Sequence, residues 1–397
     1  MKNYKTFKRI FTIVIDSVGC GEAKDAAKYG DYGTNTLKHT SLAIPDFSLP
    51  TLEKLGIGRI TEMNNVKRVA KPLGIYGRME EVSVGKDTLT GHWEMMGLKV
   101  DTPFPSFTDT GFPDDLIKEI EKLSGRKVIG NIAASGTEII KDLGEEQLKT
   151  GALIVYTSSD SVLQIAAHED IIPIPELYDI CEKVRKITLE NPKWSVGRII
   201  ARPYVGTNKD NFTRTPRRHD YSVNPTGLTT LDYLKEEGYD VISVGKIYDI
   251  FNGNGLTESN KIVSNHDGME KTVAIASRDF TGLCFVNLVD FDALYGHRRD
   301  SIGYAKALME FDNDLNELMN KLNDDDLLII TADHGNDPTH VGTDHTRENV
   351  PIILYAHNIM PYNLGLLHSF SCIGKTISDN FNVKSTEYGE IIKIERK

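Results

Sequence analysis

Six side chains of the types that bind divalent metals stand in short, widely separated segments of the chain. They are Asp16, Asp292, His297, Asp333, His334 and His345. This number of carboxylates and imidazoles suffices for two cations with three protein ligands each, and such mixed ligation suits zinc or manganese better than magnesium. Two neighbouring metals can hold the attacking and the leaving oxygen of a phosphoryl group during in-line displacement. The residue types therefore predict an enzyme that acts on phosphate esters.

The segment KDTLTGHWE, in which a turn leads into a predicted helix, supplies a candidate nucleophile. Asp87 or Thr88 stands near the start of this helix, and an ordinary N-cap is one interpretation. The other interpretation is that the Thr88 hydroxyl attacks phosphorus, while N–H groups at the helix start help to hold the phosphate. Thr90 is the local alternative to Thr88.

Three further acidic and histidine positions compete for metal-binding roles. Asp290 alternates with Asp292 along a predicted strand, so the two side chains should point to opposite faces and only one should face a metal. His340 and Asp344 lie in the same Gly-rich segment as a candidate ligand, and we interpret both as loop residues.

The candidate ligands follow apolar, β-branched runs that are typical of buried strands. These runs are 11–15 before Asp16, 241–244 before Lys246, 283–289 before Asp290 and Asp292, and 327–330 before Asp333. Helical periodicity between them, as in 301–322, predicts a mostly parallel α/β sheet flanked by helices. Ligands bind such sheets beyond the carboxyl ends of the strands, so the motifs should meet at one edge.

The segment 101–219 differs from its flanks. It begins at a Pro-rich break, DTPFPSFTDTGFP, and ends in a polar, basic stretch, TNKDNFTRTPRRHDY. It also contains its own predicted strand at 152–157 and helix at 175–188. Because the metal motifs on either side need one another, we interpret 101–219 as a smaller α/β cap domain inserted into a core of 1–100 and 220–397.

Composition narrows the class of protein. The 397 residues can fill more than one hydrophobic core. A net charge of -11 and a pI near 5.5 argue against nucleic acid or a membrane as partner. Four scattered cysteines without a CxxC pair are typical of reduced thiols. We therefore expect a cytoplasmic enzyme for small molecules, without an obligatory protein partner, whose short N-terminal apolar run is a strand and not a signal peptide.

Seven motifs form a recognisable set. They are VIDSVGCGEA, YGRMEEVSVGKDTLTGHWEMMGL, VGRIIARPYVG, RTPRRHDY, VGKIYDIF, VNLVDFDALYGHRRD and TADHGNDPTHVGTDHTREN. Together they resemble the bacterial phosphopentomutases of the alkaline phosphatase superfamily. DHGND with TDHTRE is shared by several relatives, whereas KDTLTGHWE and GRIIARP narrow the resemblance to this family. It implies an alkaline-phosphatase-like core with the inserted cap.

The resemblance also implies roles for single residues. Thr88 would be the phosphorylated nucleophile that bridges two manganese ions. One ion would be held by Asp292, His297 and His345, and the other by Asp16, Asp333 and His334. The pentose phosphate would contact Ser158, Asp160, Arg198, Arg202, Arg214 and Lys246, with Arg217 and Arg218 in the same neighbourhood.

The activity that the resemblance implies is an intramolecular phosphoryl transfer. Ribose 1-phosphate and ribose 5-phosphate, or the 2-deoxyribose pair, would interconvert through a phosphothreonine enzyme and a pentose 1,5-bisphosphate. Glucose 1,6-bisphosphate or ribose 1,5-bisphosphate would prime the enzyme. The alternatives are a cofactor-independent phosphoglycerate mutase, another metal-dependent phosphatase of the superfamily, and a metal-binding protein without catalysis.

Overall fold

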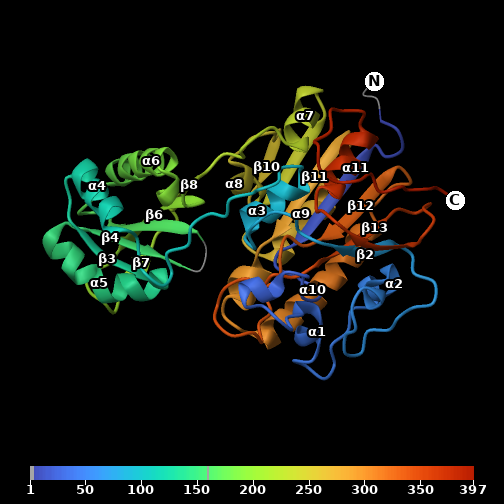
Figure 1. The fold of residues 1–397 in the computed structure, drawn as a ribbon, viewed down its shortest axis with the longest axis horizontal. Coiled ribbons are helices and arrows are strands. Elements are labelled where there is room, and N and C mark those ends of the chain that lie inside the picture. Colours follow the sequence, from blue (N-terminus) through green and yellow to red (C-terminus); the bar gives the residue numbers. More distant parts are fainter. Residues whose placement is uncertain (1–3, 159–160) are drawn as a thin grey trace. The chain divides into compact units, whose positions relative to one another are not determined.

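The computed structural model describes residues 4–158 and 161–397, which form two compact units. The first unit consists of Met1–Thr102 and Asn224–Lys397, and the second of Pro103–Val223 (Figure 1). The sequence pattern put the insertion at 101–219, so the two sets of boundaries differ by a few residues.

The first unit is built on an eight-stranded sheet with the order β10-β9-β11-β1-β12-β13-β2-β14. Strands β10 through β12 pair in parallel, whereas β13 runs antiparallel to both of its neighbours. The predicted α/β class with a mostly parallel sheet is confirmed. The strands are β1 (Arg9–Ile15), β2 (Ile75–Met79), β9 (Asp240–Gly245), β10 (Glu258–Asn260), β11 (Gly282–Leu288), β12 (Asp326–Thr331), β13 (Val350–Tyr355) and β14 (Asn363–Leu367).

Helices cover both faces of this sheet, because side chains of opposite parity on β11 meet different helices. Phe285 contacts His92 of α3 and Phe251 of α8, whereas Leu288 lies against Gly268 of α9. The helices of this unit are α1 (Thr36–Ser41), α2 (Pro50–Leu55), α3 (Thr88–Met95), α7 (Thr230–Glu236), α8 (Ile247–Phe251), α9 (Asn265–Ala276), α10 (Ser301–Met319) and α11 (Cys372–Asn380). Short turns of other helical types are η1 (Ala26–Tyr29), η2 (Ile57–Arg59) and η4 (Phe291–Gly296).

The second unit has its own six-stranded mixed sheet, in the order β3-β4-β5-β6-β7 with β8 paired to β6. Its strands are β3 (Val128–Ala133), β4 (Leu153–Thr157), β5 (Val162–His168), β6 (Arg198–Val205), β7 (Thr213–Arg214) and β8 (His219–Ser222). Its helices are α4 (Asp114–Ser124), α5 (Gly136–Thr150), α6 (Ile174–Glu190) and the short η3 (Pro192–Trp194).

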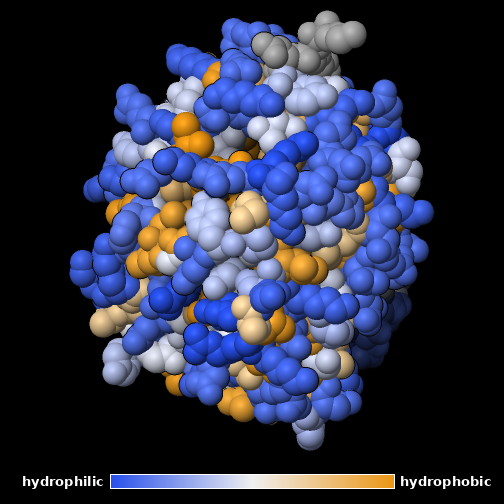
Figure 2. Space-filling model, turned by 90° about the vertical axis from the view of Figure 1, so that its right-hand side faces the viewer, coloured by the Kyte–Doolittle hydropathy of each residue, from blue (hydrophilic) through white to orange (hydrophobic). Residues whose placement is uncertain are grey.

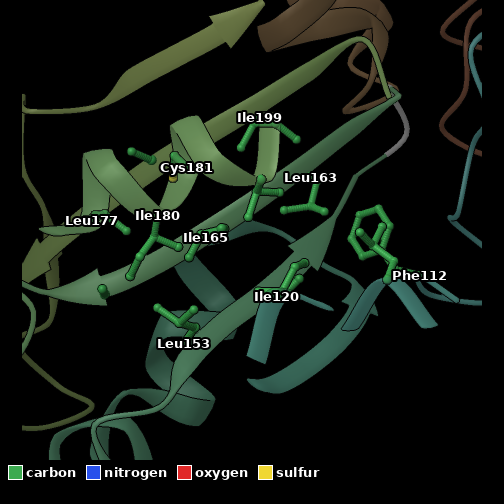
Figure 3. Packing of buried hydrophobic residues seen from close by; sticks show 14 of the residues in the cluster. Phe112, Ile120, Leu153, Leu163, Ile165, Leu177, Ile180, Cys181 and Ile199 are labelled. Atoms are coloured by element: carbon green, nitrogen blue, oxygen red, sulfur yellow. The ribbon is translucent and has the colours of Figure 1, made fainter. Parts of the chain in front are cut away.

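The two faces of this smaller sheet differ. Leu153, Leu163 and Ile199 face α4 and α6 in a buried aliphatic core (Figure 3). The opposite face, with Ile154 and Tyr204, is covered by α5 only in part. The remainder of that second face carries polar and charged side chains, among them Gln164, Arg202 and Asp220.

The surface of the described residues shows neither a membrane-spanning helix nor, on the face drawn in Figure 2, a separate apolar region. No helix in the part of the chain that the structure describes is long and apolar enough to span a membrane. On the face seen in Figure 2, hydrophobic side chains are scattered among hydrophilic ones. Apolar residues distributed in this way are ordinary on protein surfaces.

Candidate active site

The candidate metal ligands lie together because three adjacent parallel strands end at one edge of the large sheet. Asp16 follows β1, the central strand of the three, and Asp333 follows its neighbour β12. Asp292 lies in η4, which follows β11 on the other side of β1. Parallel strands in register bring their carboxyl ends to the same edge, and the ligands with them.

The first group of ligands consists of Asp292, His297 and His345, whose ligand atoms all lie within 4.8 Å of one another. His297 Nε2 is 3.1 Å from Asp292 Oδ2 and also 3.1 Å from His345 Nε2. His345 Nε2 is 3.3 Å from the other carboxylate oxygen of Asp292. These are the three residues that the resemblance assigned to one ion.

The second group that meets the same distance consists of Asp16, Asp292 and His334. The resemblance assigned Asp333 to this group in place of Asp292. Oδ2 of Asp333 lies 3.3 Å from His334 Nε2. Its other oxygen, Oδ1, accepts a hydrogen bond from the Ser17 backbone at 3.0 Å. Asp292 thus lies between the two groups and can contribute to either, while Asp333 remains at the edge of the second.

All three histidine ligands have the same orientation. Nδ1 faces a backbone carbonyl in each, namely Thr343 O for His297, Lys86 O for His345 and Gly335 O for His334, at 2.7, 2.8 and 3.0 Å. A carbonyl only accepts, so we assign the proton to Nδ1 and the lone pair to Nε2. Each Nε2 then points into the site as a neutral imidazole does in a metal centre.

The electrostatics of the site are dominated by buried carboxylates. Burial, with the nearby Asp333 and Asp292, raises the pKa of Asp16 well above its usual value. Burial acts in the same direction on Asp292, but His297 and His345 in their protonated forms outweigh it and lower the pKa of Asp292 well below its usual value. Burial also lowers the pKa of His334, which favours its neutral form. The cluster therefore concentrates negative charge that a cation would offset.

The residues fit divalent metals. Asp16 Oδ1 and Asp333 Oδ2 are buried and have no hydrogen-bond partner within residues 4–158 and 161–397, a costly arrangement unless an ion completes it. The two Nε2 lone pairs of His297 and His345 face each other at 3.1 Å, where they repel unless a cation lies between them. Mixed imidazole and carboxylate donors of this kind suit transition metals.

The two candidate nucleophiles differ in their partners. Thr88 is the first residue of α3, and its Oγ1 lies 3.3 Å from His334 Nε2. Asp87 is the N-cap of α3 and accepts hydrogen bonds from both the backbone and the hydroxyl of Thr90. The Thr90 hydroxyl is thus engaged by Asp87, while that of Thr88 faces the ligands.

The structure corrects the physical reason given for choosing between Asp290 and Asp292. Strand β11 ends at Leu288, so strand alternation does not apply to these two residues. Asp292 instead points inward from the π-helical segment η4, whereas Asp290 caps it and exchanges hydrogen bonds with Asn265. Only Asp292 belongs to a group of ligands.

Three other predicted positions surround the site. Lys246 follows β9, and its charge lowers the pKa of Asp16, against the larger effect of burial. The Lys246 ammonium has no ion pair or hydrogen bond with any residue that the structure describes. His340 and Asp344 lie outside both ligand groups, near Asp31 and Lys86 respectively, in agreement with their interpretation as loop residues.

The predicted arginines lie on the second unit, on one face of its sheet. Arg198 and Arg202 are four residues apart along β6 and so lie on one face, and Arg214 of β7 pairs with Tyr204 on the same face. Asp220 of β8 pairs with Ile200 and accepts a hydrogen bond from Arg218. Among the residues that the structure describes, Arg198, Arg202, Arg214 and Arg218 thus share this face with Asp220. Ser158 stands at the end of β4, and Asp160 lies outside the described residues.

Sequence reasoning missed buried charged residues that hold the loops of the site. The Glu348 carboxylate accepts hydrogen bonds from Gly21 N, Thr36 N, Thr36 Oγ1 and Thr346 Oγ1. It fills the space beside Gly19 and Gly335, where an added Cβ would lie only 2.4 and 2.6 Å from its oxygens. In the sequence, the only sign of this role is that Glu348 lies three residues after His345. That position does not indicate its partners Gly21 and Thr36, which are far away in the chain.

Similarity to known proteins identifies the family of this chain. The model of the metalloenzyme superfamily matches residues 8–385. The chain is 56% identical over 382 residues to the phosphopentomutase of Clostridium tetani, with 96% of both chains covered. It is 55% identical over 386 residues to the phosphopentomutase of Clostridium beijerinckii, covering 96% of this chain and 97% of that one. A solved protein of Pyrococcus horikoshii has a TM-score of 0.51 at 15% identity, covers 97% of this chain and 100% of that chain, and is similar in fold alone.

Proposed function

The chain belongs to the phosphopentomutases of the metalloenzyme superfamily, and we propose that it interconverts ribose 1-phosphate and ribose 5-phosphate, and the 2-deoxyribose pair. As a member of this family it is an enzyme, an isomerase that moves a phosphoryl group within a molecule. The observation that carries the proposal is the Thr88 hydroxyl, which starts a helix and lies 3.3 Å from His334 Nε2 among buried metal-binding side chains.

In the proposed cycle, Thr88 carries the phosphoryl group between turnovers. A hydroxyl of the bound pentose phosphate attacks phosphothreonine, so that the P–O bond to Thr88 breaks and a pentose 1,5-bisphosphate forms. The Thr88 oxygen then attacks the other phosphoryl group of this intermediate, which releases the isomeric monophosphate. The proton that the first hydroxyl loses is balanced by the one that the leaving hydroxyl gains.

The residues around Thr88 provide orientation and charge. The N–H groups at the start of α3 that do not donate to Asp87 would hold phosphate oxygens, as helix N-termini commonly do. Asp292, His297 and His345 would hold one metal, and Asp16, His334 and Asp333 the other. When bound, such ions neutralise phosphate charge and favour the deprotonated form of a coordinated hydroxyl. Lys246 is a further cation for the substrate.

The phosphate that is not transferred needs its own binding groups, and we infer that the arginine face of the second unit provides them. Arg202 is largely buried, and burial together with Arg218 lowers its pKa, so the crowded cations favour an anionic partner. Arg214 is exposed and free to turn toward a ligand. Guanidinium groups bind phosphate oxygens in pairs. Ser158 and Asp160 would contact the sugar.

We further infer manganese as the metal, a sugar bisphosphate as the priming activator, and the cytoplasm as the location. Three imidazoles and three carboxylates form a donor set in which manganese is well accommodated. A bisphosphate such as glucose 1,6-bisphosphate can load Thr88 without changing the cycle. All four cysteines are free and buried, which suits a reducing compartment.

The test uses the purified protein after treatment with a phosphatase. Without a bisphosphate, it should show a lag or no conversion of ribose 1-phosphate. Catalytic amounts of glucose 1,6-bisphosphate should abolish the lag, and mass spectrometry should then find a single phosphate on the peptide that contains Thr88. Conversion of 2- to 3-phosphoglycerate at a comparable rate would favour the phosphoglycerate mutase alternative. Full activity of the dephosphorylated protein without a bisphosphate would contradict the mechanism.

A further inference from the structure

Two fully buried polar side chains behind the site have no role in the cycle described above. His92 lies on α3 one turn after Thr88, and Asn287 lies next to the end of β11. Neither is exposed to solvent. Burying an imidazole and an amide in this way is unfavourable unless hydrogen bonds compensate, so their partners indicate what they do.

The partners of the Asn287 amide fix its orientation. One N–H of Asn287 Nδ2 donates to Asp16 Oδ2 at 2.7 Å. The other faces His92 Nε2 at 3.3 Å. With Asp16 ionised, as a metal ligand has to be, a flipped amide would place its oxygen against a carboxylate that can only accept. Asn287 therefore donates in both directions, and His92 Nε2 is the acceptor.

This orientation determines the proton position on His92. Since Nε2 accepts, the proton of the neutral ring is on Nδ1. Nδ1 lies 2.9 Å from the carbonyl oxygen of Thr88 and 3.3 Å from Asp333 Oδ2. A continuous path of hydrogen bonds thus runs from Asp16 through Asn287 and His92 to the backbone of Thr88, with Asp333 beside it.

The backbone around this path leaves little freedom for adjustment. A Cβ added at Gly91 would lie 2.2 Å from the carbonyl oxygen of Asp333, so α3 packs directly on the strand end that carries two ligands. The nucleophile and the ligands are therefore joined twice, by close backbone packing and by the buried side chains.

We propose that His92 and Asn287 are positioning residues that fix Thr88 relative to the metal ligands Asp16 and Asp333. Asn287 holds the Asp16 carboxylate in one orientation, and His92 holds the carbonyl of the nucleophile. Groups that orient ligands in this way commonly affect metal affinity and activity by about 10- to 100-fold each. The inference concerning Thr88 rests on the proposed function, whereas the inference concerning Asp16 requires only that a metal binds.

The first experiment measures Mn²⁺ binding to the metal-depleted protein by titration calorimetry. Asn287→Leu should weaken Mn²⁺ binding about 10- to 100-fold because Asp16 loses its donor. Thr12→Val is the matched control. Thr12 is a buried polar residue of β1, four residues before Asp16, and its hydroxyl has no partner among the residues described. Equal Mn²⁺ affinities in Asn287→Leu and Thr12→Val would overturn the proposal for Asn287.

The second experiment separates positioning from packing at His92. His92→Leu should lower kcat about 10- to 100-fold with little change in KM, since binding groups for the sugar are untouched. In His92→Asn the side-chain amide nitrogen can take the place of Nδ1 and donate to the Thr88 carbonyl, so much of the lost kcat should return. Equal kcat values for His92→Asn and His92→Leu would overturn the proposal for His92, as would losses that follow the thermal unfolding midpoint alone.

The two experiments fail in distinguishable ways. If the wild-type protein did not convert ribose 1-phosphate, the proposed function would be wrong, but Mn²⁺ titration of the Asn287 variant would still decide whether Asn287 positions Asp16. The other case is that the wild type converts the sugar, Asn287→Leu binds Mn²⁺ as Thr12→Val does, and His92→Leu has the same kcat as His92→Asn. The proposed function would then stand, and the positioning roles would not.

Discussion

The two units carry clusters of opposite charge, and each cluster is incomplete. At the edge of the large sheet, three buried aspartates face histidines whose Nδ1 atoms lie against backbone carbonyls. On the smaller sheet, four arginines share one face with Asp220. The first cluster requires cations and the second an anion. Under the proposed function, divalent metals would satisfy the first cluster and the phosphate of the substrate the second.

The clusters also differ in how firmly their members are held. Each histidine ligand has a second partner in the backbone, and Asp16 and Asp333 are fully buried. Arg214, in contrast, is exposed. Burial makes the acidic cluster a preorganised site, whereas the exposed Arg214 can adapt to a ligand. We therefore expect substitutions in the first cluster to act on the chemical step and those in the second to act on substrate binding.

The largest effect should come from the nucleophile. Thr88→Val should lower mutase activity by roughly 10⁴- to 10⁶-fold, because it removes a covalent step and not one contact. Thr90→Val should lose less than about 10-fold, the cost of a hydrogen bond to Asp87. Rates of primed ribose 1-phosphate conversion test this directly. Similar losses in both variants would remove Thr88 from its role.

Substitution of a metal-binding residue should have a somewhat smaller effect, which is measured as a loss of Mn²⁺ affinity. His345→Ala should weaken Mn²⁺ binding by more than about 100-fold, since even residues behind a ligand contribute 10- to 100-fold. His340→Ala should bind Mn²⁺ normally, because His340 belongs to neither ligand group. Elemental analysis after dialysis measures the retained metal. Full retention in His345→Ala would contradict the assignment of the first group.

Those parts of the site that follow apolar strands could be predicted from the sequence. Asp16 and Asp333 come directly after buried runs, and topology alone brings adjacent strand ends together. Thr88 could be placed near a helix start from local residue types. The residue types alone did not divide the ligands between two ions, which only the family resemblance did. In the structure Asp292 lies within reach of both groups, so the division depends on distances that no sequence pattern determines.

Residues that support the site from a distance could not be predicted. Glu348, His92 and Asn287 act through partners that are far away in sequence, so no local pattern marks them. Asp290 and Asp292 could not be assigned correctly from strand alternation because the strand ends before both. The sequence predictions thus failed where a role depends on long-range contacts or on the residue at which β11 ends. Local propensity determines neither of these.

Substitution in the arginine face should affect substrate binding. Arg214→Ala should raise KM for ribose 5-phosphate roughly 10- to 100-fold, as expected for a lost charge-assisted hydrogen bond. The ratio of hydrolysis to mutase activity should also rise, because water then competes for phosphothreonine. Arg217→Ala is the matched control, since the Arg217 guanidinium is paired with Glu169 on the surface. An unchanged KM in Arg214→Ala would exclude this arginine from the phosphate site.

The smallest effects concern stability, and they should have opposite signs in the two clusters. Arg218 and Arg198 outweigh burial and lower the pKa of Asp220, so its ionised form stabilises the fold. Asp220→Asn should therefore destabilise the protein by about 1.5 kcal/mol at pH 7. The raised pKa of Asp16 means that its ionised form is unfavourable without metal. Asp16→Asn should stabilise the metal-free protein by about 1 kcal/mol at pH 7.

The pH dependence of unfolding distinguishes these two cases from a nonspecific effect of substitution. Because the pKa of Asp220 is lower in the folded state, its contribution is present above its usual value of 3.8 and is lost as pH falls further. The difference between wild type and Asp220→Asn should thus remain constant from neutral pH to about pH 5 and shrink below 3.8. For Asp16 the folded pKa is raised, so the metal-free wild type loses stability as pH rises above 3.8, and the advantage of Asp16→Asn grows over that range. Urea unfolding of the metal-depleted proteins at several pH values measures both differences.

Excess Mn²⁺ should reverse the sign of the stability difference between Asp16→Asn and the wild type, since the wild-type carboxylate then binds the ion that the amide binds poorly. A destabilised metal-free Asp16→Asn protein at neutral pH would mean that the acidic cluster is already balanced by the protein itself.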